Sequence, residues 1–230
     1  MQAVILAAGK GTRMNHLTEN NNKTMLEVGG KPILEYKLDI LPDEIDEIIF
    51  VIGYHGDMIK KYFGSKFKNK KIKYVVQKKL NGTGGAVYRT KDLIKGKFLV
   101  LMGDDLYGKK DLEKLIKYDL AVLGYEVENP GQFGVIRVDK NGDMVEVIEA
   151  PHKTRKYRLA NTAVYVLNKD FFKYKLVPKK PGDFEYGLPQ TMASMAKEHR
   201  IKVVKASAWH QITCPEDLTL AERISRKFLK

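Results

Sequence analysis

The residues best suited to chemistry lie near the start of the chain. The short apolar run of residues 4–8 opens into a glycine-rich basic loop over residues 9–14, and a lysine follows at Lys23. A short, unbroken apolar run bounded by glycine is typical of a buried parallel strand. Glycine lets backbone N–H groups approach a ligand closely, and the cationic groups of Arg13 and Lys23 suit phosphate oxygens. The pattern predicts a loop that holds a polyphosphate.

The glycine-rich loop could also be an ordinary turn after a strand. Its spacing completes neither the GxGxxG fingerprint of dinucleotide-binding folds nor the GxxxxGK[ST] motif of P-loop proteins. Both of these phosphate-binding motifs are therefore excluded.

Two more polar positions follow apolar strands. Asp104 and Asp105 come directly after the run of residues 98–102, where a carboxylate can ligate Mg²⁺, although such an aspartate can also serve only a turn or a helix cap. Gln77 precedes a glycine-rich segment over residues 82–86, and its amide can pair with the edge of a base. A glutamine exposed on a loop is the alternative.

The first half of the sequence alternates strands and helices, which predicts a parallel sheet covered by helices. The predicted strands are residues 3–7, 48–52, 72–76 and 98–102, and the predicted helices are residues 32–40, 57–63, 85–93 and 110–117. In such sheets ligands bind beyond the carboxyl ends of the strands, which is where the polar positions fall.

The second half predicts antiparallel additions to this core. Its predicted strands are residues 120–127, 134–139, 144–149, 160–167 and 201–205, and its predicted helices are residues 185–199 and 215–228. The pair Asn141-Gly142 indicates a hairpin between the second and third of these strands.

Residues 6–14 and 23–34 resemble the opening of the sugar-1-phosphate nucleotidylyltransferases, and the resemblance extends to residues 209–218. It implies an α/β, Rossmann-like fold: a mixed, mainly parallel sheet with helices on both faces and an antiparallel sugar-binding extension. It further implies one nucleotidyltransferase domain over residues 1–230, with a nucleotide-binding half (1–118) and a sugar-phosphate-binding half (119–230). The form of the Gln77 loop is similar to the uridylyl- and thymidylyl-transferring members.

The resemblance assigns a role to each matching position. It makes Arg13 and Lys23 the catalytic contacts to the triphosphate, and Asp104 and Gln211 the ligands of Mg²⁺. The expected nucleotide-binding residues are Leu6, Ala7, Ala8, Gly9, Gly11, Thr12, Gln77, Gly82 and Thr83. The expected sugar-binding residues are Gly134, Glu149 and Asn161.

Two positions depart from the family pattern. Ala150 stands where the family usually has the lysine that holds the sugar phosphate, and His152 or Lys153 is the expected substitute. Gln211 stands where the family usually has a second metal-binding aspartate; a carboxamide oxygen is a legitimate ligand for a hard cation but lacks charge.

Composition narrows the class of protein. The net charge is +13, but the lysines are scattered and no aromatic-basic motif accompanies them, so nucleic acid is not an expected partner. One cysteine permits no intrachain disulfide, and no signal peptide or membrane-length apolar run is visible, so we expect a cytoplasmic protein that does not bind membranes. The sequence leaves a homo-oligomer open.

These observations together predict an Mg²⁺-dependent enzyme that forms a nucleoside diphosphate sugar and pyrophosphate, with UTP or dTTP favoured over purine nucleotides. Two alternatives stay open. One is a cytidylyltransferase that acts on a non-sugar phosphate such as phosphocholine. The other is a regulatory protein that binds a nucleotide or sugar phosphate and has lost turnover, for which the departures at Ala150 and Gln211 are the only support.

Overall fold

The computed structural model describes residues 1–224 and 228. Four parallel strands form the centre of the fold: β1 (Gln2–Ala7), β4 (Glu47–Ile52), β6 (Lys70–Val76) and β7 (Phe98–Met102). They lie in the order β7-β1-β4-β6, and the short strand β5 (Lys66–Phe67) adds antiparallel to β6. All residues of β1 and β4 are buried, as the apolar runs that follow Gln2 and Glu47 predict. The predicted parallel core is confirmed.

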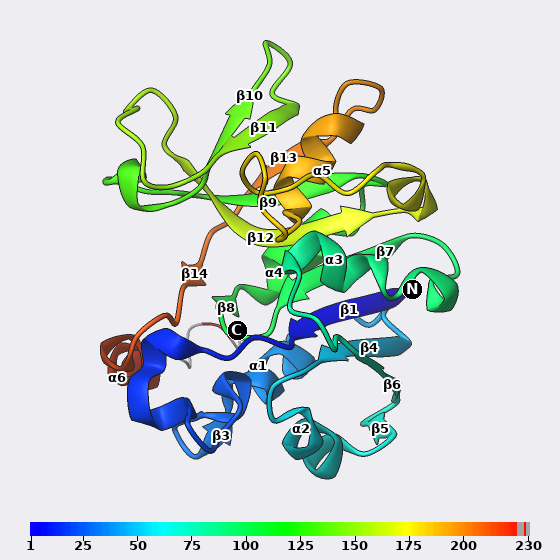
Figure 1. The fold of residues 1–230 in the computed structure, drawn as a ribbon, viewed down its shortest axis with the longest axis vertical. Helices are drawn as coiled ribbons and strands as arrows, with labels where there is room; N and C mark the ends of the chain where they lie inside the picture. The colour runs from blue at the N-terminus through cyan, green and yellow to red at the C-terminus, as the bar shows by residue number, and fades with distance from the viewer. Residues whose placement is uncertain (225–227, 229–230) are drawn as a thin grey trace.

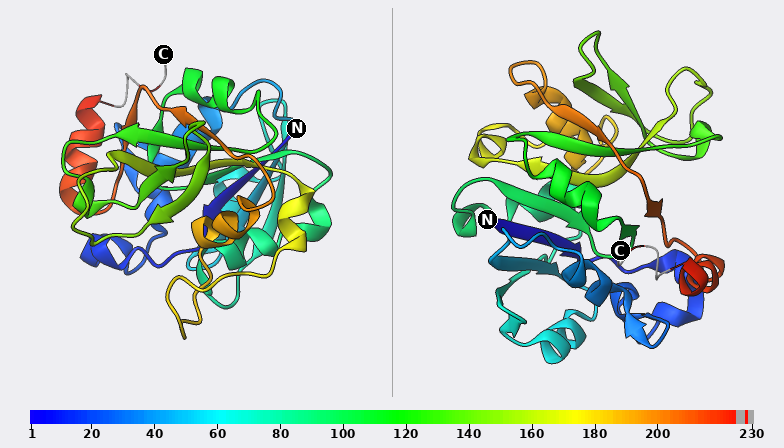
Figure 2. Two further views of the ribbon diagram at one scale, coloured as in Figure 1. Left: turned by 90° about the horizontal axis from the view of Figure 1, so that it is seen from above. Right: turned by 180° about the vertical axis from the view of Figure 1, so that it is seen from behind.

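The antiparallel strands continue the same sheet beyond β7. The long strand β12 (Leu159–Leu167) pairs antiparallel with β7 and also with β9 (Ala121–Glu126) and β10 (Val135–Val138). Strand β11 (Met144–Ile148) forms the predicted hairpin with β10, and β13 (Lys202–Lys205) runs parallel to β9. Figures 1 and 2 show these strands stacked above the parallel core, so the two predicted halves share one sheet.

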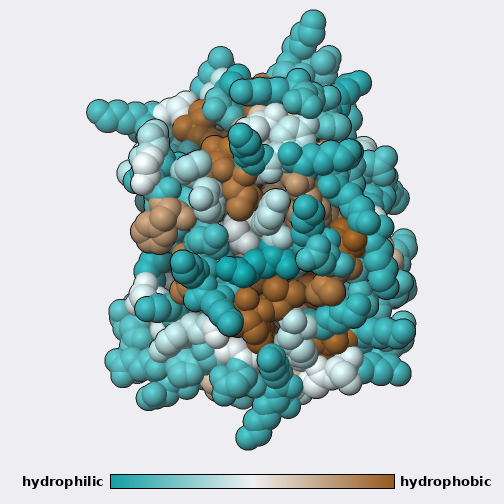
Figure 3. Space-filling view, turned by 45° about the vertical axis from the view of Figure 1, so that its right-hand side comes forward, coloured by the Kyte–Doolittle hydropathy of each residue, from teal (hydrophilic) through white to brown (hydrophobic). Residues whose placement is uncertain are grey.

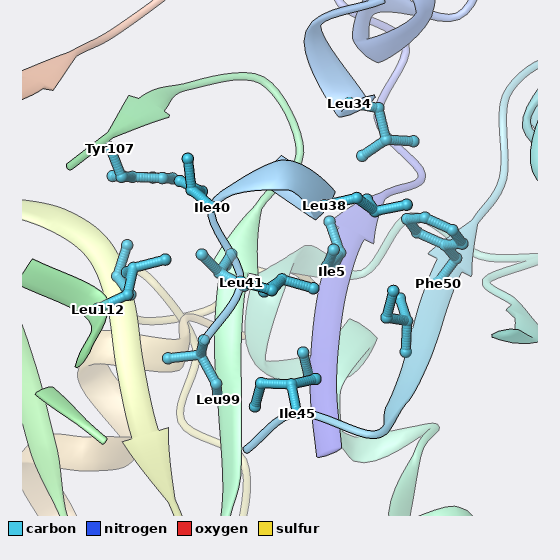
Figure 4. Close-up of a cluster of buried hydrophobic side chains, with 14 of the residues drawn as sticks. Ile5, Leu34, Leu38, Ile40, Leu41, Ile45, Phe50, Leu99, Tyr107 and Leu112 are labelled. Carbon is cyan, nitrogen blue, oxygen red and sulfur yellow. The ribbon is translucent and has the colours of Figure 1, made fainter. Parts of the chain in front are cut away.

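Helices cover both faces of the sheet, as expected. On one face α1 (Ile33–Asp39), α2 (Gly56–Phe63) and α4 (Lys109–Leu115) pack over a hydrophobic cluster, part of which is drawn in Figure 4. On the other face α3 (Gly82–Tyr88) and α5 (Leu188–Met195) pack over a second cluster. Burial of these two clusters supplies the main driving force for the fold.

A third, smaller cluster joins the two ends of the chain. The 3₁₀ segments Thr12–Thr18 and Lys23–Met25 and the hairpin of β2 (Glu27–Val28) and β3 (Lys31–Pro32) pack against α6 (Pro215–Ile224). A two-stranded sheet of β8 (Leu106–Tyr107) and β14 (Trp209–His210) lies beside this cluster. These contacts hold the C-terminal motif next to the glycine-rich loop.

Two helices differ from the prediction in their bounds: α3 was predicted over residues 85–93, and α5 ends at Met195 rather than at residue 199. Helix α5 begins at Leu188 rather than at residue 185, because residues 178–186 form a separate hairpin and Gly187 caps the helix. Helix α3 begins at Gly82 and ends at Tyr88, where Thr90 bonds back to the carbonyl of Val87 and starts a 3₁₀ turn. The predicted helix over 215–228 extends at least to Ile224, and residues 225–227 lie outside the described part of the chain.

The surface is largely hydrophilic. Figure 3 shows apolar surface gathered in the middle of one face and surrounded by hydrophilic side chains. Among the described residues, no helix combines the length and the hydropathy that a bilayer crossing requires.

Candidate nucleotide and sugar-phosphate site

Three cavities adjoin one another beyond the carboxyl ends of β1 and β7. They have volumes of about 200, 230 and 320 Å³, and we call them the loop cavity, the central cavity and the glycine cavity. Met102, the last residue of β7, lines all three. They therefore form one groove at the edge of the sheet where α/β folds bind ligands.

The glycine-rich loop forms the wall between the loop cavity and the glycine cavity. Gly11 has a φ of +66°, and a Cβ atom at this position would lie 2.8 Å from the Cβ of Lys23. The hydroxyl of Thr18 donates to the carbonyl of Gly11 at 3.0 Å and fixes the turn. Glycine is thus required at position 11 both by the left-handed backbone and by the close approach of Lys23.

Lys23 is buried, and its ammonium group is aimed at the groove. Its Nζ donates to Oδ2 of Asp104 at 2.5 Å, and both residues line the loop and central cavities. The position of Lys23 is fixed by Asn22, whose side chain accepts from the backbone N–H of Thr24 and donates to the carbonyl of Ala7 at the end of β1. The exposed Arg13 lines the same two cavities.

The second aspartate of the pair faces the interior instead of the loop cavity. Asp105 is 5% exposed and accepts a hydrogen bond from Nε1 of Trp209 at 3.0 Å. Burial raises the pKa of Asp105, the charge of Asp104 raises it further, and the positive charge of Lys37 opposes both. Burial in turn lowers the pKa of Lys37, and the two aspartates oppose that shift. The site thus contains two lysines and two aspartates within mutual electrostatic reach.

The glycine cavity is bounded by Gln77 and by a hairpin that the sequence did not indicate. The amide nitrogen of Gln77 donates to Oδ1 of Asn81 and to the carbonyl of Gly82, both at 3.1 Å. A Cβ on Gly82 would collide with the carbonyl oxygen of Tyr186, in the hairpin of residues 178–186. Gly82 is therefore needed for packing against this hairpin, a requirement separate from its predicted contact with a nucleotide.

The far end of the central cavity carries polar groups suited to hydroxyls. Glu149 accepts from Nε2 of Gln190 at 2.8 Å, and the side-chain amide of Asn161 donates to the hydroxyl of Tyr165 at 2.8 Å. All four of these residues line the central cavity. Gly134 does not line any of the three cavities; its carbonyl accepts from the backbone of Asn161, and it lies against the carboxylate of Glu149.

The oxygen donors needed for a hard cation are present in the groove. Asp104 and the exposed Gln211 line the central cavity together. Among residues 1–224 and 228, no group of three or more histidine, cysteine or acidic residues could form a complete metal site. One carboxylate and one carbonyl oxygen fit Mg²⁺, which commonly takes few protein ligands and completes its shell with phosphate oxygens and water.

The structure brings nearly all the predicted site residues to this groove. Gly134 is the one that does not line it. His152 and Lys153, the expected substitutes for the missing lysine, line a separate cavity of about 610 Å³ with Arg155 and Arg158.

Among the polar residues that were not predicted from the sequence, Lys179 and Gln190 line the groove, whereas Lys37 is buried and lines none of the three cavities. Lys179 lines the central and glycine cavities, and Gln190 contacts Glu149. The sequence carries no motif for them. The only signal was at Lys37, which stands on the apolar face of a predicted helix, where a charged residue is unusual.

Comparison with known proteins agrees with this groove. Residues 2–224 match the sequence profile of the family described as Nucleotidyl transferase. A similar protein is the bifunctional protein GlmU of Methanocaldococcus jannaschii, which is 35% identical over 224 residues; the match covers 97% of this chain and 54% of that protein. The chain spans about half the length of the GlmU proteins it matches.

Other relatives match over their full length. The UTP–glucose-1-phosphate uridylyltransferase AglF of Haloferax volcanii is 30% identical over 233 residues, with 97% of this chain and 96% of that protein covered. The crystal structure of a putative glucose-1-phosphate thymidylyltransferase from Bacillus anthracis superimposes with a TM-score of 0.83 at 26% identity, covering 98% of this chain and 95% of that one.

Proposed function

Because the chain belongs to the nucleotidyl transferase family, we propose that it joins a nucleoside triphosphate to a sugar 1-phosphate and releases pyrophosphate. One observation carries the proposal. The cations suited to a triphosphate, Arg13 and Lys23, share the central cavity with Glu149 and Asn161, which suit sugar hydroxyls. Two anionic substrates can therefore meet in one groove beside Asp104.

The reaction needs no nucleophile from the protein. A phosphate oxygen of the sugar 1-phosphate attacks the α-phosphorus, the new O–P bond forms, and the bond to the β-phosphate bridging oxygen breaks in line. Lys23 would stabilise the charge that gathers at the α-phosphate, and Arg13 would hold the departing pyrophosphate. Catalysis of this kind depends on positioning and on electrostatic stabilisation.

We further propose that Asp104 and Gln211 hold Mg²⁺, which supplies charge neutralisation at the phosphates when it is bound. Asp104 would contribute the only formal charge of this ligand pair. The free protein should consequently bind Mg²⁺ weakly and rely on the nucleotide to complete the site.

The hydrogen bonds of Gln77 support a preference for UTP or dTTP. Its amide nitrogen is committed to Asn81 and Gly82, so only its carbonyl oxygen is left to face a base. An acceptor matches the N3–H of uracil or thymine, whereas N3 of cytosine and N1 of adenine are acceptors themselves. Gln77 would therefore favour a base that presents a ring N–H at this point, as uracil and thymine do, over cytosine, whose ring N3 is an acceptor.

Lys179 is our candidate for the cation that replaces the missing lysine at position 150. It lines the central cavity, whereas His152 and Lys153 do not. Its Nζ pairs with Glu185 at 2.6 Å, across the hairpin of residues 178–186. A lysine in this place can contact the phosphate of the sugar while Glu185 limits its movement.

The proposal is tested by measuring pyrophosphate release with Mg²⁺ for ATP, GTP, CTP, UTP and dTTP against a panel of sugar 1-phosphates. We expect turnover with UTP or dTTP and at least one sugar 1-phosphate. Turnover only with CTP and phosphocholine would favour the non-sugar cytidylyltransferase. Nucleotide binding without pyrophosphate release from any pair would favour a regulatory protein that has lost turnover.

A further inference from the structure

The far end of the central cavity is formed in part by a break in the regular pairing of β12. This strand lies between β7 and β9 (Figure 1). Three steps along β12, from Asn161 to Val164, are matched by a single step along β9, so Thr162 and Ala163 form a β-bulge. Neighbouring side chains of a regular strand point to opposite faces of the sheet. The bulge instead brings three consecutive residues, Asn161, Thr162 and Ala163, to the wall of the cavity.

The bulge holds Ala163 in a backbone conformation that suits glycine. Its φ is +57°, and among residues 1–224 and 228 it is the only non-glycine residue with a positive φ that lies inside a β-strand. In this left-handed conformation the Cβ atom comes too close to the following carbonyl oxygen, a clash that glycine avoids. Alanine at position 163 therefore carries a conformational cost.

Hydrogen bonds on both sides fix this conformation. The backbone N–H of Ala163 donates to Oδ1 of Asn161 at 3.1 Å, and the hydroxyl of Thr162 donates to the carbonyl of Leu123 at 2.8 Å. The carbonyl of Thr162 accepts from the hydroxyl of Tyr107 at 3.1 Å. A strained residue that its surroundings hold in place is typical of a binding or catalytic site.

The surroundings of Ala163 leave little room and few free partners for a large polar group. The central cavity has a volume of about 230 Å³, and Glu149 and Asn161 line it together with Ala163. The side-chain amide of Asn161 is already engaged, because it accepts from the N–H of Ala163 and donates to the hydroxyl of Tyr165. A polar group that is buried without hydrogen-bond partners is unfavourable.

We propose that Ala163 is a specificity-determining residue: its methyl group narrows the far end of the central cavity, so that a hexose 1-phosphate binds in preference to an N-acetylhexosamine 1-phosphate. The acetamido group adds bulk, an N–H and a carbonyl to the sugar ring, whereas a hydroxyl is small and can donate to Glu149. The choice of sugar rests on the proposed function, but the strain at Ala163 does not.

Thermal unfolding tests the strain. Ala163→Gly removes the left-handed clash, so Tm should stay unchanged or rise by up to about 4 °C. Ala160→Gly is the matched control in the same strand: Ala160 is fully buried, has no positive φ and lines none of the three cavities. Its replacement should lower Tm by roughly 3–7 °C. An equal loss of Tm in the two variants would overturn the proposal.

Calorimetric titration tests the choice of sugar. Glucose 1-phosphate and N-acetylglucosamine 1-phosphate are titrated with Mg²⁺, with and without α,β-methylene-UTP, which cannot release pyrophosphate. The native protein should bind glucose 1-phosphate more tightly. Ala163→Gly should shift the ratio of the two Kd values toward the N-acetyl sugar by roughly tenfold or more. Ala163→Ser, which adds a hydroxyl instead of removing the methyl group, should prefer glucose 1-phosphate at least as strongly as the native protein, and Ala160→Gly should leave the ratio unaltered.

The outcomes separate this inference from the proposed function. An unaltered ratio in folded Ala163→Gly, a native preference for the N-acetyl sugar, or no binding of either sugar phosphate would overturn the inference, whether or not pyrophosphate is released in the substrate panel. A shifted ratio without pyrophosphate release from any pair would support the inference and contradict the proposed enzymatic function.

Discussion

The ammonium group of Lys23 lies 2.5 Å from a carboxylate oxygen of Asp104, although 81 positions separate the two residues in the sequence. Lys23 follows the glycine-rich loop after β1, and Asp104 follows β7, the neighbouring parallel strand. A phosphate that binds Lys23 and a cation that binds Asp104 would therefore arrive side by side. In the proposed reaction the two residues would act together.

Removal of the charge at Lys23 should abolish most of the activity. We expect Lys23→Ala to lower turnover by roughly 100-fold or more, as for the loss of one preorganised electrostatic contact to a transition state. Lys31→Ala is the matched control, because Lys31 forms a comparable ion pair of 2.5 Å with Asp39 outside the groove. Steady-state pyrophosphate release checks both. Unchanged turnover in a folded Lys23→Ala would remove this residue from the mechanism.

Gly11→Ala should disturb Lys23 through the backbone. The left-handed conformation would be strained by about 1–2 kcal/mol, and the new methyl group would meet the Lys23 side chain. We expect turnover to fall by roughly tenfold or more, with a modest loss of Tm. Gly142→Ala is the matched control. Gly142, in the β10–β11 hairpin, also has a positive φ, of +76°, but a methyl group at this position would meet no other atom within 4 Å. Equal turnover in the two variants would show that the loop tolerates the displacement.

Gln211→Asp should tighten Mg²⁺ binding if residue 211 faces the ion. The added charge should lower the half-saturating Mg²⁺ concentration at least roughly fivefold, since even well-screened unit charges about 4 Å apart interact by about 1 kcal/mol. Titration of activity with Mg²⁺ measures this. Gln132→Asp adds the same charge in a separate cavity and should leave the value unaltered. If Gln211→Asp also leaves it unaltered, residue 211 does not contact the metal.

Lys179→Ala should weaken the sugar phosphate selectively. Loss of a charged contact to phosphate costs about 1.5–3 kcal/mol, so the KM for the sugar 1-phosphate should rise roughly 10- to 100-fold. The KM for the nucleotide should change much less, which separates this role from a general disturbance of the groove. Lys153→Ala tests the substitute that the sequence analysis expected. If this variant raises the KM for the sugar 1-phosphate more than Lys179→Ala does, Lys153 rather than Lys179 holds the sugar phosphate.

Asp143 should make the stability depend on pH in the acidic range. Its ion pairs with Lys202 and Arg200, at 2.6 and 2.8 Å, lower its pKa below the ordinary value of 3.8. A carboxyl group with a lowered pKa stabilises the fold above its ordinary pKa, and this contribution disappears as the pH falls through the folded value. Asp143→Asn should therefore lower Tm by about 2–4 °C at pH 7, and the difference should shrink as the pH falls below the ordinary value of 3.8.

Asp119→Asn provides the comparison for this experiment. Asp119 is 89% exposed and lies 3.6 Å from Lys97, so its replacement should hardly change Tm at pH 7 or pH 2. A Tm difference for Asp143→Asn that persists unchanged at pH 2 would show that the charge of Asp143 is not the cause.

Local sequence patterns were enough to predict the parallel core and to place the polar candidate residues beside it. Buried parallel strands read as unbroken apolar runs, so β1, β4 and β7 were predicted within one residue of their observed bounds. Polar residues that follow such strands must gather at one edge of the sheet, which is why Arg13, Gln77 and Asp104 could be assigned to one site from the strand pattern, whereas the role of Lys23 came from the family resemblance.

The contacts between segments that no local pattern links became visible with the folded chain. The hairpin of residues 178–186 packs on Gly82 and brings Lys179 to the groove, and β14 pairs with β8 so that Trp209 reaches Asp105. Local sequence could not reveal these contacts, because they depend on the packing of distant segments. The same holds for Lys37: its helix was predicted, but its full burial follows from how α1 packs on the sheet.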